Sequence, residues 1–437
     1  MQAVSLIYFR RDLRVHDHAA LAAAAACGLP LASVYIEPPL VQENAAESRR
    51  TAFIRQSLVD LQQNLAQHGI PLFVLSGVAE NVLPEFAVRC RAAQVWCSEA
   101  YDAEAVAQET CLAARLIEHD IAFRAVSDAV ALPKSALIQP NGEPFARFAD
   151  YRRAWLAACP PLGAYRPFAL PEDFGRQQQK LPEALRQIPP LPQRPSENGL
   201  QIVHGGEKAA GQALADFSQK LHAYPFARDF PALNGTSQLS PHLAYGTLSA
   251  RFLLDWAQQN REKDGGMLLD SLIRREFAQQ YAYHFPPRPS ENETVPLNNT
   301  QTAALLRWQN GQTGWPLVDA AMRCLAKTGL LHHRLRRLAA QFFVHHLGIA
   351  PQHGEAWFAE QLLDYEPAAN RLNWLSAAEA AYAPPTAQSQ KLDPDGRFIR
   401  RHVPELAHLD KTRIHAPFAA PFSVDTHGYP PPLAKAV

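Results

Sequence analysis

VSLIYF, at residues 4–9, is a short run of apolar and β-branched side chains with the composition of a buried strand. Runs of the same kind follow at Leu31–Ile36, Leu72–Leu75 and Gln94–Cys97. Between the second and third runs, one face of a predicted helix carries Ile54, Leu58, Leu61 and Leu65. Strands that alternate with helices indicate right-handed crossovers and a parallel sheet. We therefore predict a doubly wound, Rossmann-like α/β domain over residues 1–130.

A proline-rich stretch follows this domain between Pro160 and Pro195. Proline at this density can sustain neither a helix nor a central strand, so an extended interdomain connector is expected within residues 131–204. The connector is expected to wrap around a domain, because three aromatic side chains would otherwise be exposed to water: Tyr165, Phe168 and Phe174.

From about residue 205 the strand pattern gives way to helices. Ser240-Pro241 has the form of an N-cap followed by proline at the first helical position. A buried helix face is expected where apolar residues recur at i, i+3, i+4 and i+7, namely Leu335, Leu338, Ala339 and Phe342. Residues 205–437 are thus predicted to form an all-helical domain, and the fold class is α/β plus all-α.

The bulk composition limits the possible functions. The chain has 437 residues, 47% of them hydrophobic, which is enough for two cores. Its 42 basic and 42 acidic residues cancel, so a polyanion would have to meet a local basic patch. The six cysteines form no C-x-x-C pair, which favours buried free thiols in a reducing cytoplasm. Charges interrupt the N-terminal apolar run, and no apolar stretch reaches the roughly 18 residues of a membrane span, so we expect a cytoplasmic protein with no membrane partner.

Three segments of the helical part could carry chemistry. In Gly235–Pro241, a glycine, three hydroxyls and a predicted helix N-terminus offer donors to a phosphate, although a plain capped turn explains the same residues. His332–Arg337 gathers five cationic or titratable side chains, and the next carboxylate along the chain is Glu355, which favours a bound phosphate over a solvated face. Asp364–Asn370, followed by Trp374, could bind a ribose and a flavin and pass an electron, although a turn beside a core tryptophan fits equally.

The histidines of this part predict no metal site. Adjacent His332 and His333 point about 100° apart on a helix, and neither HExxH nor supporting cysteines are present. The sequence also lacks G-x-S-x-G, Walker A and G-x-G-x-x-G, so the α/β domain carries no standard phosphate loop.

Taken in this order, the three segments resemble the FAD-binding half of the DNA photolyase/cryptochrome family. The N-terminal Phe9–Asp17 is similar to the family's opening F-R-x-D-L-R-x-x-D. Further matches are Arg228–Pro231, Gly235–Ser240, Arg275–Phe277, Thr313–Arg323 and Ala368–Asn370. The similarity spans nearly the whole chain and is closest to the bacterial class I cyclobutane pyrimidine dimer photolyases.

The resemblance implies a role for each matching residue. The FAD phosphates and ribityl chain would be held by Tyr224, Thr236, Ser237, Gln238, Leu239 and Ser240. The isoalloxazine and adenine would be flanked by Arg275 and the Arg336–Asp364 pair, with Asn370 facing the flavin N5 and Glu366 replacing the family's second aspartate. DNA would meet a basic rim, with lesion-pocket positions beside it, formed by Arg228, Arg275, His333, Arg334, Gln388, Ser271 and Arg274.

The lesion pocket departs from the family pattern. Ser271 stands where the family has a glutamate that hydrogen-bonds the dimer. Arg274 and Ser376 stand where it has tryptophans. Stacking of an aromatic on a flipped base is worth about 1–3 kcal/mol, so weaker lesion binding is expected. The segment Ala381–Thr386 is also shorter than the family's F-R-x-F-N-P, which predicts a reshaped pocket wall.

The electron-transfer chain of the family is incomplete in this sequence. Trp374 matches the flavin-proximal tryptophan, whereas the middle and outer positions correspond to Pro351 and Asn298. Trp357 is the candidate substitute relay, and a buried core aromatic is the alternative interpretation.

The resemblance implies a monomeric carbon–carbon lyase, a deoxyribodipyrimidine photo-lyase, in which light-excited reduced FAD donates an electron to a pyrimidine dimer flipped out of DNA. The alternatives are a cryptochrome-like FAD photoreceptor with little or no repair activity and a DNA-binding redox flavoprotein that modulates repair by others. A second chromophore, such as the folate-type antenna methenyltetrahydrofolate, is implied near Tyr101 and Asp102, where a plain surface loop is the alternative.

Overall fold

The computed structural model describes residues 3–39, 48–159, 164–187, 191, 203–288, 295–419 and 424–435. The chain forms two compact units. Unit 1 comprises residues 1–199, 203–216 and 238–286, and unit 2 comprises residues 200–202, 217–237 and 287–437.

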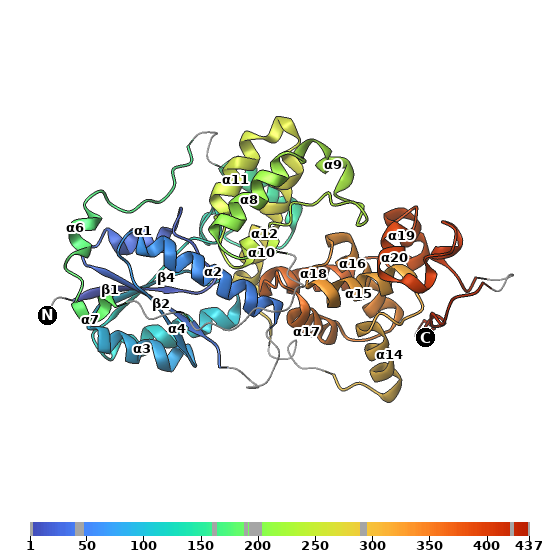
Figure 1. Ribbon diagram of the computed structural model, residues 1–437, viewed down its shortest axis with the longest axis horizontal. Coiled ribbons are helices and arrows are strands. Elements are labelled where there is room, and N and C mark those ends of the chain that lie inside the picture. Colours follow the sequence, from blue (N-terminus) through green and yellow to red (C-terminus); the bar gives the residue numbers. More distant parts are fainter. Residues whose placement is uncertain are drawn as a thin grey trace. The chain divides into compact units, whose positions relative to one another are not determined.

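A five-stranded parallel sheet forms the centre of unit 1. Its strands are β1 (Val4–Phe9), β2 (Leu31–Glu37), β3 (Leu72–Ser76), β4 (Ala92–Ser98) and β5 (Ala122–Val126), in the order β3-β2-β1-β4-β5. One face of the sheet is covered by α1 (Ala19–Ala25) and α2 (Arg49–Ala66), and the other by α3 (Ala79–Cys90) and α4 (Ala103–Ile117) (Figure 1). All six β1 side chains are buried, as expected for a strand enclosed between two helical layers. The doubly wound sheet is thus confirmed.

Helix α2 presents Leu58, Leu61 and Leu65 to the core, as its spacing predicts. Phe53, rather than the expected Ile54, completes the buried face. The helix ends at Ala66, and Gly69 follows with φ of 69°, a conformation that a side chain would strain.

The connector packs onto unit 1, because the Gln178 amide donates to Leu31 O and Gly69 O and accepts from Leu31 N. Phe174 is buried there. The expectation of a purely extended chain is wrong, because the connector contains two short helices, α6 (Phe174–Gln178) and α7 (Glu183–Arg186). Both can form because the neighbouring prolines precede the helical residues and do not lie within them. Residues 188–190 and 192–202 lie outside the described part.

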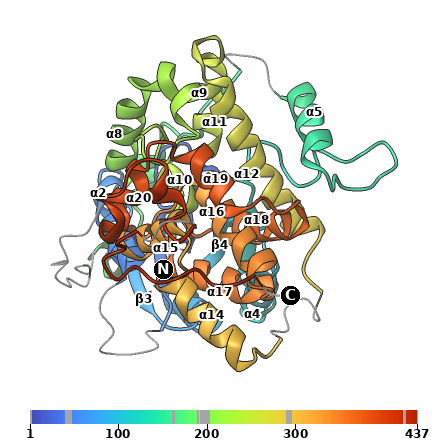
Figure 2. The same cartoon turned by 90° about the vertical axis from the view of Figure 1, so that its right-hand side faces the viewer.

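The remaining helices of unit 1 are α5 (Phe148–Ala158), most of α8 (Glu207–Ser218), α10 (Ser240–Ala244), α11 (Ala250–Gln259) and α12 (Gly266–His284). Helix α12 packs against α5 and α11 (Figure 2).

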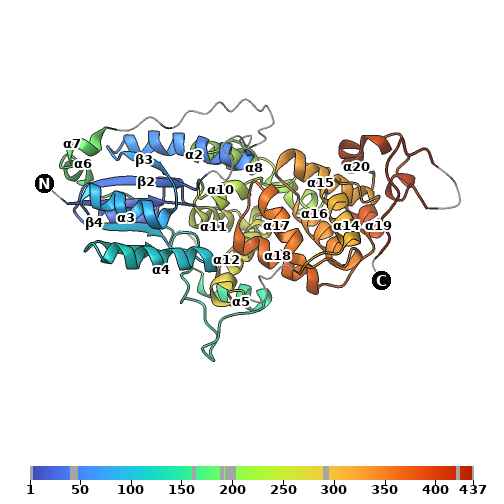
Figure 3. The ribbon, with the colours of Figure 1, turned by 90° about the horizontal axis from the view of Figure 1, so that it is seen from below.

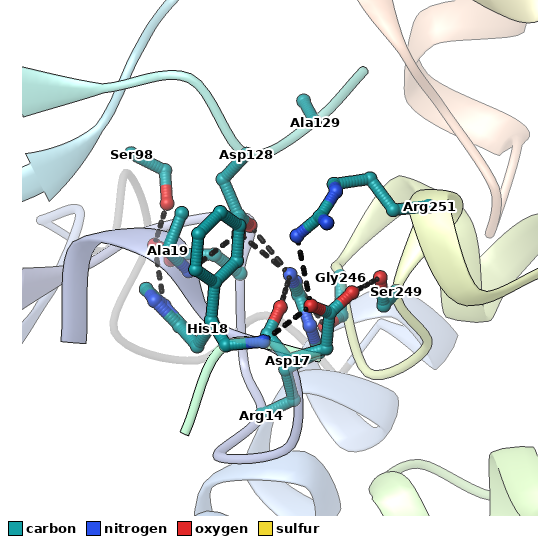
Figure 4. A network of polar contacts seen from close by, with 12 residues as sticks. Arg14, Asp17, His18, Ala19, Ser98, Asp128, Ala129, Gly246, Ser249 and Arg251 are labelled. Atoms are coloured by element: carbon teal, nitrogen blue, oxygen red, sulfur yellow. Dashed lines mark hydrogen bonds and ion pairs between the residues drawn. The ribbon is translucent and has the colours of Figure 1, made fainter. Parts of the chain in front are cut away.

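A buried polar network joins these helices to the sheet (Figure 4). Arg14 donates to both oxygens of Asp128, at 2.8 and 2.7 Å, and to Gly246 O. Asp17 accepts from the Ser249 hydroxyl and from Arg251. Because each buried charge has a hydrogen-bonded partner of opposite sign, residues 238–286 pack with the sheet although they follow the connector in sequence.

In the described part of unit 2, all regular secondary structure is helical (Figure 3). Its helices are α9 (Tyr224–Ala227), α14 (Asn299–Gln309), α15 (Pro316–Thr328), α16 (His333–Gln341), α17 (Pro351–Gln361), α18 (Pro367–Glu379), α19 (Pro385–Leu392) and α20 (Arg397–His402). A π-helical turn, Phe342–His346, extends α16. The predicted inward face of α16 is confirmed, since Leu335, Leu338, Ala339 and Phe342 are buried. Short 3-10 turns occur in this unit at Leu221–Ala223, Pro404–Leu406 and Arg413–His415, and in unit 1 at Arg261–Lys263.

Two further sequence expectations are tested by the fold. All six cysteines are free, but only Cys90 and Cys97 are buried; Cys159 and Cys324 are half-buried, and for the exposed Cys27 and Cys111 the expectation of buried thiols is wrong. Within the described ranges, none of the helices has the length and apolar character that a bilayer crossing requires.

Candidate functional site

The glycine of the Gly235–Pro241 segment permits a close approach of two parts of the backbone. A Cβ atom added to Gly235 would lie 2.4 Å from the Cβ of Ala227, at the end of α9. Thr236 and Ser237, which follow, are half-buried. Side-chain hydroxyls are therefore held on a loop that folds back against α9.

The helix after this loop begins one residue earlier than expected. Leu239, not Ser240, occupies the N-cap position, and no side-chain hydrogen bond caps the helix. Gln238, just before it, adopts φ of 54°. Helix α10 has only five residues, so its dipole adds little, and hydroxyl groups are the donors this segment offers to an anion.

Arg336 and Asp364 form an ion pair in unit 2, in which one guanidinium nitrogen donates to both carboxylate oxygens. The Arg336 Nη2 atom lies 2.8 and 2.6 Å from the two carboxylate oxygens, and Nε donates to Leu331 O at 2.8 Å. The Asp364 side chain is 3% exposed and that of Arg336 is 21% exposed. The two residues that the resemblance pairs are thus in contact, with the carboxylate buried and the guanidinium partly accessible.

Asn370 lies on the first turns of α18. Its backbone N–H donates to Glu366 O, and its Nδ2 donates to Glu355 O at 3.2 Å. This bond uses one of the two amide hydrogens and orients the buried carboxamide. Burial raises the pKa of Glu355, and nearby Arg371 opposes that shift.

The positive cluster of α16 gathers around Asp229. Arg334 donates to both Asp229 oxygens at 2.9 and 2.7 Å, and His333 Nε2 lies 3.4 Å from one of them. Arg228 Nε lies 3.9 Å from Asp229 and its guanidinium lies over the Tyr224 ring. The hydrogen bonds from Arg334 lower the pKa of Asp229. Within α16 the cluster has no carboxylate partner, as its sequence indicates, but Asp229 and Asp364 reach it from other parts of the chain and partly neutralise it.

Helix α12 of unit 1 carries three of the predicted site residues. Arg275 donates to Ala129 O at 2.9 Å and to Leu243 O at 3.2 Å. The Ser271 hydroxyl donates to Met267 O, one turn earlier, and the exposed Arg274 lies with its guanidinium 3.9 Å from the centre of the Phe148 ring. In unit 2, Gln388 donates to Ala383 O.

Trp374 lies in an aromatic cluster of unit 2. Its ring centroid is 6.3 Å from that of Trp308, 5.6 Å from Phe343 and 5.2 Å from Phe358. A Cβ at Gly354 would lie only 2.1 Å from the Trp374 ring, so this packing requires glycine there. Sequence reasoning missed Trp308 because nothing in the local pattern of α14 distinguishes it from an ordinary core residue.

His242, on α10, makes stability depend on pH. It is 1% exposed with Nδ1 2.8 Å from Thr247 Oγ1, and burial lowers its pKa from 6.5 to about 4. The unfolded chain thus takes up a proton below pH 6.5 that the native state refuses until about pH 4, and stability falls through this window as the pH drops. We expect His242→Gln to reduce the slope of unfolding free energy against pH there by up to about 1.4 kcal/mol per pH unit.

Urea unfolding at several values between pH 4 and pH 7 measures this slope. The exposed Gln67 supplies a control without a titratable group, since Gln67→Ala should retain the wild-type slope. An unchanged slope in His242→Gln would show that this histidine is not the group that titrates.

Comparisons with known proteins agree on one family. The DNA photolyase family model matches residues 5–172, and the model of the FAD binding domain of DNA photolyase matches residues 268–436. The deoxyribodipyrimidine photo-lyase of Vibrio cholerae is 33% identical over 97% of this chain and 95% of that protein. A bacterial class III photolyase from Agrobacterium tumefaciens superposes with a TM-score of 0.83 at 28% identity, covering 100% of this chain and 95% of that one. A cryptochrome from Synechocystis sp. PCC6803 gives a TM-score of 0.81 at 27% identity, covering 99% and 96%.

Proposed function

The chain belongs to the DNA photolyase family, and from this premise we propose that it is a light-driven DNA repair flavoenzyme, a deoxyribodipyrimidine photo-lyase that splits cyclobutane pyrimidine dimers. The observation that carries the proposal is the Arg336–Asp364 pair, whose buried carboxylate and partly accessible guanidinium lie within the matched FAD-binding domain. Because desolvation offsets much of the Coulombic gain of a buried pair, stability alone explains it poorly, and the resemblance implies that this pair flanks the isoalloxazine and adenine of FAD.

The side chains present suit FAD as a ligand. The hydroxyls of Thr236, Ser237 and Ser240 are hydrogen-bond donors for a diphosphate. Gly235 has no side chain, which lets the loop lie close to α9. Asp364 would accept from hydroxyl or amine groups, and the Asn370 amide would face a ring nitrogen. Tyr224, Gln238, Leu239, Arg275 and Glu366 complete the proposed set. When bound and excited by light, reduced FAD supplies an electron to the dimer.

DNA is proposed to meet the cationic residues around Asp229. Arg228 and Arg334 share one carboxylate, so the group keeps a net positive charge. Burial lowers the pKa of neighbouring His332 to about 4, so this histidine is neutral at pH 7 and adds no charge. His333 and Gln388 would add hydrogen bonds. Contacts of this kind go mainly to phosphates and hold a damaged site without reading a base sequence.

The substituted lesion-pocket positions support weaker binding of the pyrimidine dimer. Ser271 directs its hydroxyl to its own helix, where the family has an acid. Arg274 already lies on Phe148, and a planar guanidinium can also stack on a base. We propose that Arg274 partly replaces the missing tryptophan, at the cost of lesion affinity and not of the lyase reaction itself.

The repair assay tests this function directly. Flavin-loaded, reduced protein is illuminated with a dimer-containing oligonucleotide, and restored thymines are quantified by chromatography. We expect restoration in the light and none in the dark, with saturation only at raised substrate concentration. Protein that keeps FAD and retains the DNA but restores no thymine would eliminate repair and favour the cryptochrome-like alternative.

The folate-type antenna is a further proposal that rests on family membership. The Tyr101 hydroxyl lies 3.1 Å from Ser127 Oγ, and Lys134 lies over its ring. Asp102 accepts from Ala105 N at the start of α4. An antenna near these residues would therefore have to share groups that already have contacts in unit 1.

The division into an α/β domain (1–130), a connector (131–204) and a helical FAD-binding domain (205–437) is also a proposal. It is supported by the strands, which end at Val126, and by the helices of the later described residues. Packing, by contrast, joins residues 238–286 to the sheet. We propose that the protein acts as a cytoplasmic monomer.

A further inference from the structure

Two tryptophans of unit 2 are in edge-to-face contact inside a shell of aromatic rings. Trp308, on α14, is fully buried, and its ring plane makes an angle of 70° with that of Trp374. Phe358 is stacked on Trp308 at 5.8 Å and 12°, and Phe343 lies 4.7 Å from it. The four rings therefore form one continuous π-contact through the core of the unit.

The fold fixes this contact from three helices and a turn. Trp308 comes from α14, Trp374 from α18 and Phe358 from α17, while the π-helical turn Phe342–His346 supplies Phe343. A π-helical turn places its side chains off the regular register of the preceding helix and often occurs at functional positions. The Trp308–Trp374 geometry is thus set by tertiary packing and not by a mobile side chain.

We propose that Trp308 is the redox partner of Trp374, replacing the relay position at which this chain has Pro351. The inference rests on the proposed photochemical function. One electron leaves Trp374 for the photoexcited flavin, and one electron then passes from Trp308 to Trp374. Trp374 is restored, Trp308 is left oxidised by one electron, and an external thiol at the protein surface returns that electron by tunnelling, because the buried ring is out of its direct reach. No bond forms or breaks in the transfer between the two rings.

The surroundings of the two indoles determine the chemical form of the oxidised state. Trp308 Nε1 and Trp374 Nε1 are both buried, with no hydrogen-bond partner among the described residues. The oxidised ring thus has no adjacent base to take its proton, and the transfer needs no proton movement. The faces of Phe343 and Phe358 stabilise a positive charge in this dry site. Trp308 therefore carries the charge as a protonated cation radical.

Trp357 is a weaker partner on geometric grounds. It is partly buried on α17 and packs against the edge of the same core. Among the described residues, the rings in contact with Trp374 are those of Trp308, Phe343 and Phe358. Because electron tunnelling weakens steeply with distance, a ring in direct contact is favoured over one at the edge.

The experiment compares Trp308→Phe with Trp357→Phe in flavin-loaded protein under blue light with a thiol reductant. We expect Trp308→Phe to lower the rate of lasting flavin photoreduction about fivefold or more, and Trp357→Phe to stay within about twofold of wild type. Transient absorption should show less of the protonated tryptophan cation radical in Trp308→Phe. In the dark, its near-ultraviolet circular dichroism should lose the signal of the coupled indole pair.

Trp315→Phe is the matched control, because Trp315 also packs against this core but makes its ring contacts with Phe342 and His346. If Trp308→Phe loses its flavin, Trp308→Tyr serves as the second variant. Its ring is hard to oxidise without a proton acceptor, so the same fall in the rate of flavin photoreduction is expected. Wild-type photoreduction in the Trp308 variant, or a loss confined to Trp357→Phe, overturns the inference while repair stands. Wild-type protein that takes up no flavin defeats the proposed function as well.

Discussion

Asp364→Ala is expected to release most of the bound FAD and to lower the free energy of unfolding by about 3 kcal/mol. The Asp364 carboxylate is almost fully buried, and its removal leaves Arg336 with a poorly solvated charge and two lost hydrogen bonds. The partial exposure of Arg336 keeps the loss at the lower end for a broken buried pair. The ratio of flavin to protein absorbance and urea unfolding of the apoprotein measure the two effects separately.

Asp395→Ala provides the comparison for this prediction. Asp395 lies 3.4 Å from Arg397, and both side chains are more than half exposed. Solvent screens such a pair, so the variant should lose no more than about 0.5 kcal/mol and should keep its flavin. Equal flavin content in Asp364→Ala and Asp395→Ala would remove the Arg336–Asp364 pair from the cofactor site.

Sequence reasoning succeeded where short-range pattern determines structure. The apolar runs of β1 and β2 are buried on both faces and those of β3 and β4 are buried or half-buried, so their composition alone reveals them. β5 was missed, because its edge position leaves Ala122, Arg124 and Ala125 exposed and removes the apolar signal. The predicted start of α10 is one residue late, since a serine before a proline matches a cap whether or not its hydroxyl makes the bond.

Long-range packing explains what the sequence could not reveal. The partner of Arg334 is Asp229, 105 residues away along the chain, so a search for nearby carboxylates could not find it. The sequence favours Trp357 as a relay because it lies six residues after Pro351, yet the tertiary fold brings Trp308 against Trp374. The pairing of Arg336 with Asp364, by contrast, is implied by the family resemblance, and the two side chains are in contact.

Glu276→Leu is expected to lower the free energy of unfolding by about 4 kcal/mol or more. The Glu276 carboxylate on α12 is 2% exposed and accepts four hydrogen bonds. The donors are Ala131 N, Leu132 N, Trp155 Nε1 and Tyr151 Oη, at 2.7, 3.2, 2.8 and 3.3 Å. A leucine leaves these donors buried without an acceptor, and each unsatisfied group costs about 1–3 kcal/mol.

Two further variants separate the buried network from ordinary helix contacts. Glu276→Gln keeps one acceptor oxygen but turns an amide toward other donors, so an intermediate loss of about 2 kcal/mol is expected. Asp270→Ala removes an exposed ion pair with Arg152 between α12 and α5, and it should lower the free energy of unfolding by less than about 1 kcal/mol. Urea midpoints that rank Asp270→Ala as the more damaging change would contradict this account. Because α12 also carries Ser271, Arg274 and Arg275, the Glu276 network fixes the helix that presents the proposed lesion and cofactor contacts of unit 1.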